Sequence, residues 1–147
     1  MAPLIVLIVV TGIARLIGLL MPLSLFDSWS SATAFGLAAM FLMTGISHFT
    51  SRRRAGLVAI VPPWVPAPAI VVSVTGVLEI AGAIALLLPQ FRTFSAACLG
   101  LLLIAMFPAN IYAAADKRHP DAPHTRLLPR TLYQLLYLVA IAVTIWG

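Results

Sequence analysis

The stretch FSAACLGLLLIAMFPANIYAAA, from Phe94 to Ala115, contains no charged residue. A helix of about 20 apolar residues spans the hydrocarbon core of a bilayer, so this stretch is long enough to cross it. Four other apolar runs lie on either side of it, at roughly residues 3–21, 32–49, 69–88 and 127–146. The sequence therefore predicts an all-α integral membrane protein with five transmembrane helices.

The overall composition supports the same fold class. Hydrophobic residues make up 62% of the 147 residues and charged residues only 9%, with a mean hydropathy of +1.08. A soluble domain carries far more charge on its surface. Five spans use nearly all of the length, so we expect one transmembrane domain over residues 1–147.

The first two runs need separate consideration. The first has no basic residue before its apolar stretch and contains Arg15, which favours a retained helix over a cleavable signal peptide. The second run, residues 32–49, is the shortest and the richest in small residues. It is counted as a span, although it could lie inside the bundle instead of facing lipid.

The distribution of basic residues predicts the orientation in the membrane, because Lys and Arg near the ends of spans stay on the cytoplasmic side. On the far side, the loop between the third and fourth spans holds only Arg92. We therefore expect a bacterial inner-membrane protein with a cytoplasmic N-terminus and an external C-terminus. Anionic lipid accounts for the net charge of +5, so membrane lipid is the expected partner and nucleic acid is not. The basic residues of the two predicted cytoplasmic loops are Arg52, Arg53, Arg54, Lys117, Arg118 and Arg126.

The segment between the second and third spans, AGLVAIVPPWVPAP at residues 55–68, is apolar but contains four prolines and follows three arginines. It is too short and too interrupted to cross the membrane. Its composition suits a connector in the membrane interface, or a re-entrant lid over an inner pocket. Both interpretations stay open at this point.

Cysteine and histidine usage limits the chemistry. A dithiol oxidoreductase needs two thiols, and this chain has only Cys98. His119 and His124 lie in a loop with no metal-ligand spacing and no acidic cluster. The sequence predicts neither self-contained thiol chemistry nor a metal site.

Ionisable residues inside predicted spans are the strongest functional signal, because a charge in hydrocarbon costs several kcal/mol unless it is paired, neutral or hydrated. Arg15 and Glu79 lie about 18 Å and about 14 Å from the cytoplasmic ends of their spans, at about 1.5 Å per residue. These similar depths predict that Arg15 reaches Glu79. The same counting places further polar side chains in the inner half of the membrane: Thr44, His48, Thr75, Asn110 and Gln134.

This polar layer has two interpretations. In the structural one, Glu79 and Arg15 hold two helices together, while interhelical hydrogen bonds add about 0.6 to 2 kcal/mol each. In the functional one, the layer lines a cavity open to the cytoplasmic interface. There Glu79 binds or moves a proton, while His48, Asn110 and Gln134 orient a polar headgroup or ring.

Four segments together resemble the DoxX family of small bacterial membrane proteins: TGISHF at residues 44–49, VPPW at 61–64, TGVLEI at 75–80 and FPANIY at 107–112. The resemblance extends over about residues 35–146. It implies a four-helix transmembrane bundle, to which residues 1–21 add an N-terminal helix.

The resemblance also suggests two functions, because one DoxX relative is a subunit of a thiosulfate:quinone oxidoreductase and others act in membrane-protein assembly. The first is a redox-associated subunit that binds a quinone or lipid-like molecule and works with a soluble or membrane redox partner. The alternative is a non-catalytic scaffold or assembly factor. Whether the chain is an enzyme and whether it forms a homo-oligomer stay open. Residues His48, Glu79 and Asn110 match family-like polar positions.

Overall fold

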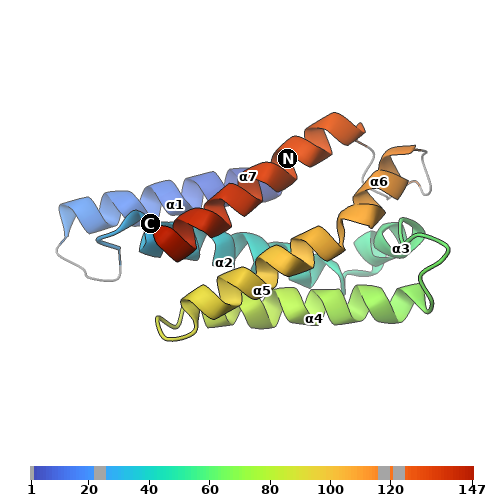
Figure 1. The fold of residues 1–147 in the computed structure, drawn as a ribbon, viewed down its shortest axis with the longest axis horizontal. Helices are drawn as coiled ribbons and strands as arrows, with labels where there is room; N and C mark the ends of the chain where they lie inside the picture. The colour runs from blue at the N-terminus through green and yellow to red at the C-terminus, as the bar shows by residue number, and fades with distance from the viewer. Residues whose placement is uncertain (1, 22–25, 116–119, 121–124) are drawn as a thin grey trace.

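The computed structural model describes residues 2–21, 26–115, 120 and 125–147, and no strand occurs within these ranges (Figure 1). Pro22 and the loop residues Lys117, Arg118, His119 and His124 lie outside them. The described helices are α1 (Ala2–Leu20), α2 (Trp29–Ser47), α3 (Ser51–Ala59), α4 (Pro68–Leu86), α5 (Arg92–Ala105), α6 (Phe107–Ala115) and α7 (Leu127–Trp146).

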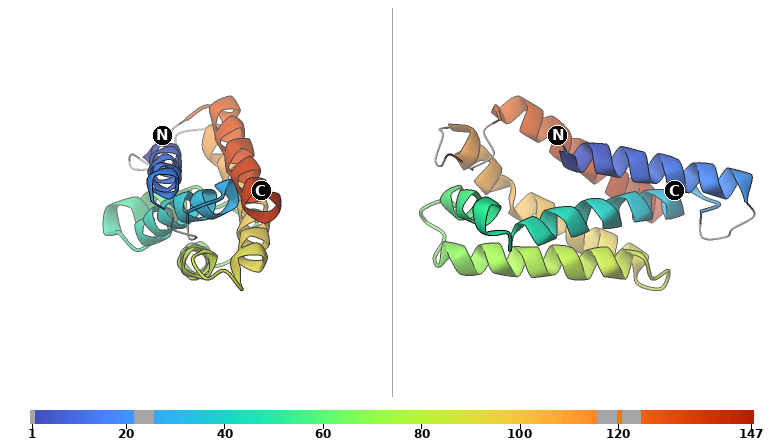
Figure 2. Two further views of the ribbon diagram at one scale, coloured as in Figure 1. Left: turned by 90° about the vertical axis from the view of Figure 1, so that its left-hand side faces the viewer. Right: turned by 180° about the vertical axis from the view of Figure 1, so that it is seen from behind.

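Five helical segments are long and apolar enough to cross a membrane: α1, α2, α4, α7, and α5 with α6 as one segment, Arg92–Ala115. The predicted helical fold with five candidate spans is therefore confirmed. The remaining helix, α3, has nine residues, and three arginines, Arg52, Arg53 and Arg54, follow its first residue. It lies at the same end of the bundle as α6 (Figures 1 and 2).

Helix α2 is the central element of the bundle and packs against α1, α4 and α7. Just over half of the residues in the apolar stretch of α2 are buried, compared with 11% in that of α1. Its start is capped by the hydroxyl of Ser28, which accepts a hydrogen bond from the amide of Ser31 at 3.1 Å. The small residues of this run therefore reflect burial between neighbouring helices. The core around α2 includes Leu37, Phe41, Leu86, Leu99 and Ile141.

Helices α2 and α4 approach each other most closely at two glycines. A Cβ atom at Gly45 would lie 3.1 Å from the carbonyl oxygen of Gly76, and one at Gly76 would lie 2.7 Å from the Cβ of His48. Contacts this short leave no room for a side chain. Small residues thus bring these two backbones together, as they do in other membrane bundles.

The spans do not begin at a common depth. Figures 1 and 2 show α4 beginning at the end of the bundle that holds α3 and α6, whereas the N-terminus of α1 lies partway along it. Helix α1 packs closely on α2, where Gly36 faces Leu7 and Thr11. This axial offset decides which polar residues can meet.

The fourth span is broken between α5 and α6, at Met106. Pro108 has no amide hydrogen, so the carbonyl of Ile104 loses its helical partner there. The chain turns at this break, and α6 leaves the axis of α5 (Figure 1). The break moves residues 107–115 away from the line of a straight helix.

The close approach of α2 and α4 gives the first prediction. Replacing Gly76 by Val should lower the free energy of unfolding by about 1 to 3 kcal/mol, because the new side chain overlaps His48 and Phe49. Gly12→Val is the matched control, since a Cβ at that helical glycine meets nothing within 4 Å. Thermal unfolding in mild detergent measures both. Equal effects of the two substitutions would contradict the packing described.

Candidate functional site

The centre of the site is a contact between His48 and Glu79, which are 7% and 3% exposed. His48 follows the last turn of α2, and its Nε2 lies 3.6 Å from Oε1 of Glu79 on α4. The hydroxyl of Thr44 donates a hydrogen bond of 2.6 Å to the other carboxyl oxygen, Oε2. Thr44 and His48 are four residues apart, so the end of α2 presents both to the same neighbour.

The other ring nitrogen fixes the tautomer of His48. Its Nδ1 lies 2.8 Å from the carbonyl oxygen of Val72, an atom that can only accept, so Nδ1 carries a hydrogen. Nε2 then faces the carboxyl group, and a favourable contact there requires a proton on either His48 or Glu79. Thr75 completes this wall, with its hydroxyl 3.2 Å from Nδ1. Both nitrogens of the His48 ring therefore face a polar group of α4.

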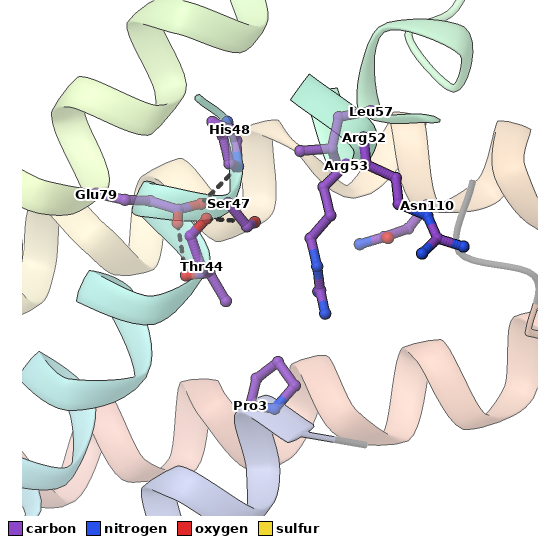
Figure 3. A pocket seen from close by; sticks show the side chains of 9 residues that line it. All are labelled: Pro3, Thr44, Ser47, His48, Arg52, Arg53, Leu57, Glu79 and Asn110. Atoms are coloured by element: carbon purple, nitrogen blue, oxygen red, sulfur yellow. Dashed lines mark hydrogen bonds and ion pairs between the residues drawn. The ribbon is translucent and has the colours of Figure 1, made fainter. Parts of the chain in front are cut away.

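A polar cavity of about 570 Å³ opens in front of this pair (Figure 3). Among the described residues that line it, Glu79 is the acidic one, and Arg52 and Arg53 are the cationic ones. Pro3, in the first turn of α1, faces them from the opposite side (Figure 3). The remaining lining residues are Thr44, Ser47, His48, Leu57 and Asn110.

An apolar cavity of about 360 Å³ adjoins the polar one beneath α3 and the proline-rich segment. His48, Leu57 and Asn110 line both cavities and form their common wall. Trp64 of the proline-rich segment packs edge-on against Tyr112 of α6, with ring centroids 6.5 Å apart. The other lining residues are mostly aliphatic and include Ile60, Val61, Val72 and Met106.

Arg54 holds α3 in place above these cavities. One guanidinium nitrogen donates to the carbonyl oxygen of His48 at 3.1 Å, and another donates to Ala69 O at 3.0 Å and Ser73 Oγ at 2.9 Å. The segment then enters α4 through Ala67, whose φ of 50° is left-handed. A non-glycine residue adopts this conformation at a cost of about 1 kcal/mol. The Arg54 hydrogen bonds and the turn at Ala67 together hold α3 across the end of the bundle.

Asn110 belongs to a second polar cluster, built at the break between α5 and α6. Its side chain donates to Gln134 Oε1 at 3.3 Å and accepts from Arg130 at 3.1 Å. Gln134 in turn donates to the carbonyl oxygen of Leu103 at 2.9 Å, close to the interrupted turn. Arg130 also donates to the carbonyl oxygen of Thr125 at 3.0 Å. This network ties α7 to the broken span.

Arg15 lies elsewhere, and its predicted pairing with Glu79 is wrong. Its guanidinium donates to the carbonyl oxygens of Phe26 and Asp27, at 3.3 Å and 2.8 Å, and stacks over Trp29. Because Pro3 borders the same cavity as Glu79, Arg15 is about 18 Å further along the axis at about 1.5 Å per residue. The depth count assumed that all spans begin together.

The other predicted site residues fall into two groups that meet at the cavities. His48, Thr75 and Glu79 lie together at the α2–α4 contact, whereas Asn110 and Gln134 form the cluster at the broken span. No group of three or more His, Cys, Asp or Glu side chains that could hold a metal occurs within the described ranges. The single cysteine, Cys98, is exposed on α5.

Sequence reasoning placed Thr44 in the polar layer but missed three other contributors. Arg130 could have been found from spacing, because it is four residues from Gln134, a predicted site residue, and therefore on the same helix face. Arg52 and Arg53 were interpreted only as markers of orientation. No sequence signal indicates that these two line a cavity while Arg54 bonds to backbone carbonyls.

Comparison with known proteins places the chain in a family. Residues 37–145 match a family described as a domain of unknown function, DUF8561. This match includes most of α2, all of α3 to α6, and α7 almost to its end, and so contains both cavities except Pro3. No curated protein and no solved structure matches the chain. Because the match covers well over half of the sequence, the chain belongs to the DUF8561 family.

Proposed function

We propose that this protein binds an amphipathic molecule of the quinone or lipid type at the junction of its two cavities. The supporting observation is that a polar cavity and an apolar cavity share a wall formed by His48, Leu57 and Asn110. Small-molecule sites are typically concave and mostly apolar, with a few placed polar groups. A molecule with a polar head and an apolar body fits this arrangement.

The His48–Glu79 pair gives the proposed site a proton to exchange. Nε2 of His48 and Oε1 of Glu79 lie 3.6 Å apart, and both residues line the cavity that would admit ligand and solvent. For a quinone ligand, reduction to the quinol consumes two electrons and two protons. A redox partner would supply the electrons, the pair would supply one proton, and water in the polar cavity would supply the other. The resemblance to the DoxX family supports this redox-associated role.

The proposed orientation places the cavities on the cytoplasmic side of a bacterial inner membrane. The basic residues that border the polar cavity, Arg52 and Arg53, are of the type that stays cytoplasmic. In this orientation the N-terminus is cytoplasmic and the C-terminus external. Helix α3 and the proline-rich segment then lie in the inner interface, where their apolar and basic side chains suit the boundary between lipid and water.

A scaffold role is the second candidate, and a specific observation favours it. The Asn110–Arg130–Gln134 network satisfies polar groups and a backbone carbonyl around the broken span. Such a network serves helix packing without any ligand. A scaffold would need this cluster for stability but would not need the open cavities.

The ligand-binding proposal is tested by replacing Glu79 with Gln. The amide can still accept the Thr44 hydrogen bond and can donate to a neutral His48, so the bundle should remain folded, with a melting temperature within a few degrees of wild type. The exchangeable proton is lost. Native mass spectrometry of protein purified in mild detergent should show a quinone or lipid of defined mass on the wild type and not on Glu79→Gln.

The control for this test is Asp27→Asn, which makes the same chemical change in an exposed loop before α2. It should retain the bound molecule. A wild-type protein that carries no ligand while staying folded would contradict the proposal and favour the scaffold.

A second test closes the apolar cavity. Ala109→Phe should place a ring in the space beneath the proline-rich segment and lower ligand occupancy by about tenfold or more, while the helix stays intact. Ile111→Phe adds an aromatic ring two residues away, at an exposed position that lines neither cavity. Ligand occupancy, measured by native mass spectrometry, should fall for Ala109→Phe and stay unchanged for Ile111→Phe. Unchanged occupancy would show that the ligand does not use this cavity.

The broken-span network yields a stability prediction. Gln134→Leu should lower the free energy of unfolding by about 1 to 2 kcal/mol, because the carbonyl of Leu103 and the amide of Asn110 both lose a partner. Thr131→Val, one turn earlier on α7, removes a hydroxyl bonded only within its own helix and should change it by less than about 0.5 kcal/mol. Thermal unfolding measures both, and equal values would show that the network does not stabilise the span.

A further inference from the structure

We propose that the polar cavity binds the anionic headgroup of a phospholipid through Arg52 and Arg53, with part of its apolar chain in the adjoining cavity. This rests on the proposed function, since it takes the same binding site and selects the lipid over the neutral quinone. Two observations carry it: the different surroundings of the three arginines, and the wall that the two cavities share at Leu57.

The three consecutive arginines do different things. The guanidinium of Arg54 donates hydrogen bonds to His48 O at the end of α2 and to Ala69 O and Ser73 Oγ of α4. Arg52 and Arg53 line the polar cavity, and Figure 3 shows Arg53 extending across it toward Pro3. Orientation in the membrane needs positive charge only on one side. It does not require two guanidinium groups to enter a cavity.

The charge around the opening favours an anion. Glu79 lies on the deeper wall, where it accepts from Thr44 and faces His48. Within the described residues the side chain of Arg53 makes no hydrogen bond or ion pair, and it lines the cavity. Pro3 places the first turn of α1 at the same opening, and the start of a helix carries partial positive charge.

The chemistry of guanidinium groups suggests what the anion is. Arginine forms paired, charge-assisted hydrogen bonds with the oxygens of a phosphate group. A free phosphate ion would use the polar cavity alone. The apolar cavity of about 360 Å³ next to it is better accounted for by a phosphate that carries an apolar chain.

The position of Leu57 supplies the path between head and chain. Leu57 is four residues after Arg53 on α3, so both side chains lie on one face of that helix. Arg53 lines only the polar cavity, whereas Leu57 lines both. A lipid held by Arg53 can therefore pass its chain over Leu57 into the space bordered by Val61 and Trp64.

The test is a binding titration by native mass spectrometry with full-length protein in mild non-ionic detergent. The probes are phosphatidylglycerol and phosphatidylcholine with identical acyl chains, a short-chain ubiquinone, and inorganic phosphate. Wild type should bind phosphatidylglycerol about tenfold or more tightly than phosphatidylcholine. The double variant R52Q/R53Q should lose most of this preference, because charge-assisted hydrogen bonds are removed.

Two variants act as controls. Arg126→Gln removes one positive charge, as Arg53→Gln does, at an exposed position that borders neither cavity, and it should keep the preference to within about twofold. Arg53→Lys keeps the charge and should retain part of the preference. It also keeps the test decisive if the double variant fails to fold, since Arg53→Gln can then be compared with Arg53→Lys at matched melting temperature.

Several outcomes would overturn the inference. Equal affinity for the two phospholipids, or equal losses in Arg126→Gln and R52Q/R53Q, would show only general surface attraction. Inorganic phosphate that binds as tightly as phosphatidylglycerol would identify a free ion as the ligand. Ubiquinone binding that is insensitive to the arginine variants but lost in Glu79→Gln would reject the lipid while keeping the proposed function. Binding of no probe would reject both.

Discussion

The close contact of α2 and α4 at Gly45 and Gly76 is the constraint on which the polar site depends. In a bilayer, helices associate through van der Waals packing and hydrogen bonds, because lipid chains are as apolar as the side chains they replace. Without Cβ atoms at these two positions, the backbones come close enough for Thr44 and His48 to reach Glu79. These partners offset the cost of a buried carboxyl group, which hydrocarbon alone would not tolerate.

The break in the fourth span is the second feature on which the site depends. Irregular backbone at membrane depth needs partners from neighbouring helices, and Gln134 supplies one for the carbonyl of Leu103. After the break, Asn110 of α6 borders both cavities and Tyr112 meets Trp64 of the proline-rich segment. Packing and cavity formation therefore come from the same interruption.

Much of the candidate site could be identified from sequence, because polar side chains inside apolar runs must find partners. His48, Glu79, Asn110 and Gln134 were all recognised in this way. Their partners were not, since a count of residues from the end of a run gives depth only when the helices begin together. Helix α1 begins partway along the bundle (Figure 2), so Arg15 reaches the backbone at residues 26 and 27 and not Glu79.

Five candidate membrane spans can be identified from the amino-acid sequence, because hydropathy and run length depend on composition and on the thickness of a bilayer. The polar residues within those runs can be identified in the same way. The folded structure was needed to show that Glu79 meets His48, that Arg54 bonds to backbone carbonyls while Arg53 faces a cavity, and that two cavities share a wall at Leu57. The axial offset and rotation of each helix depend on the sum of many short contacts with its neighbours. The hydropathy pattern of one segment carries no information about those contacts.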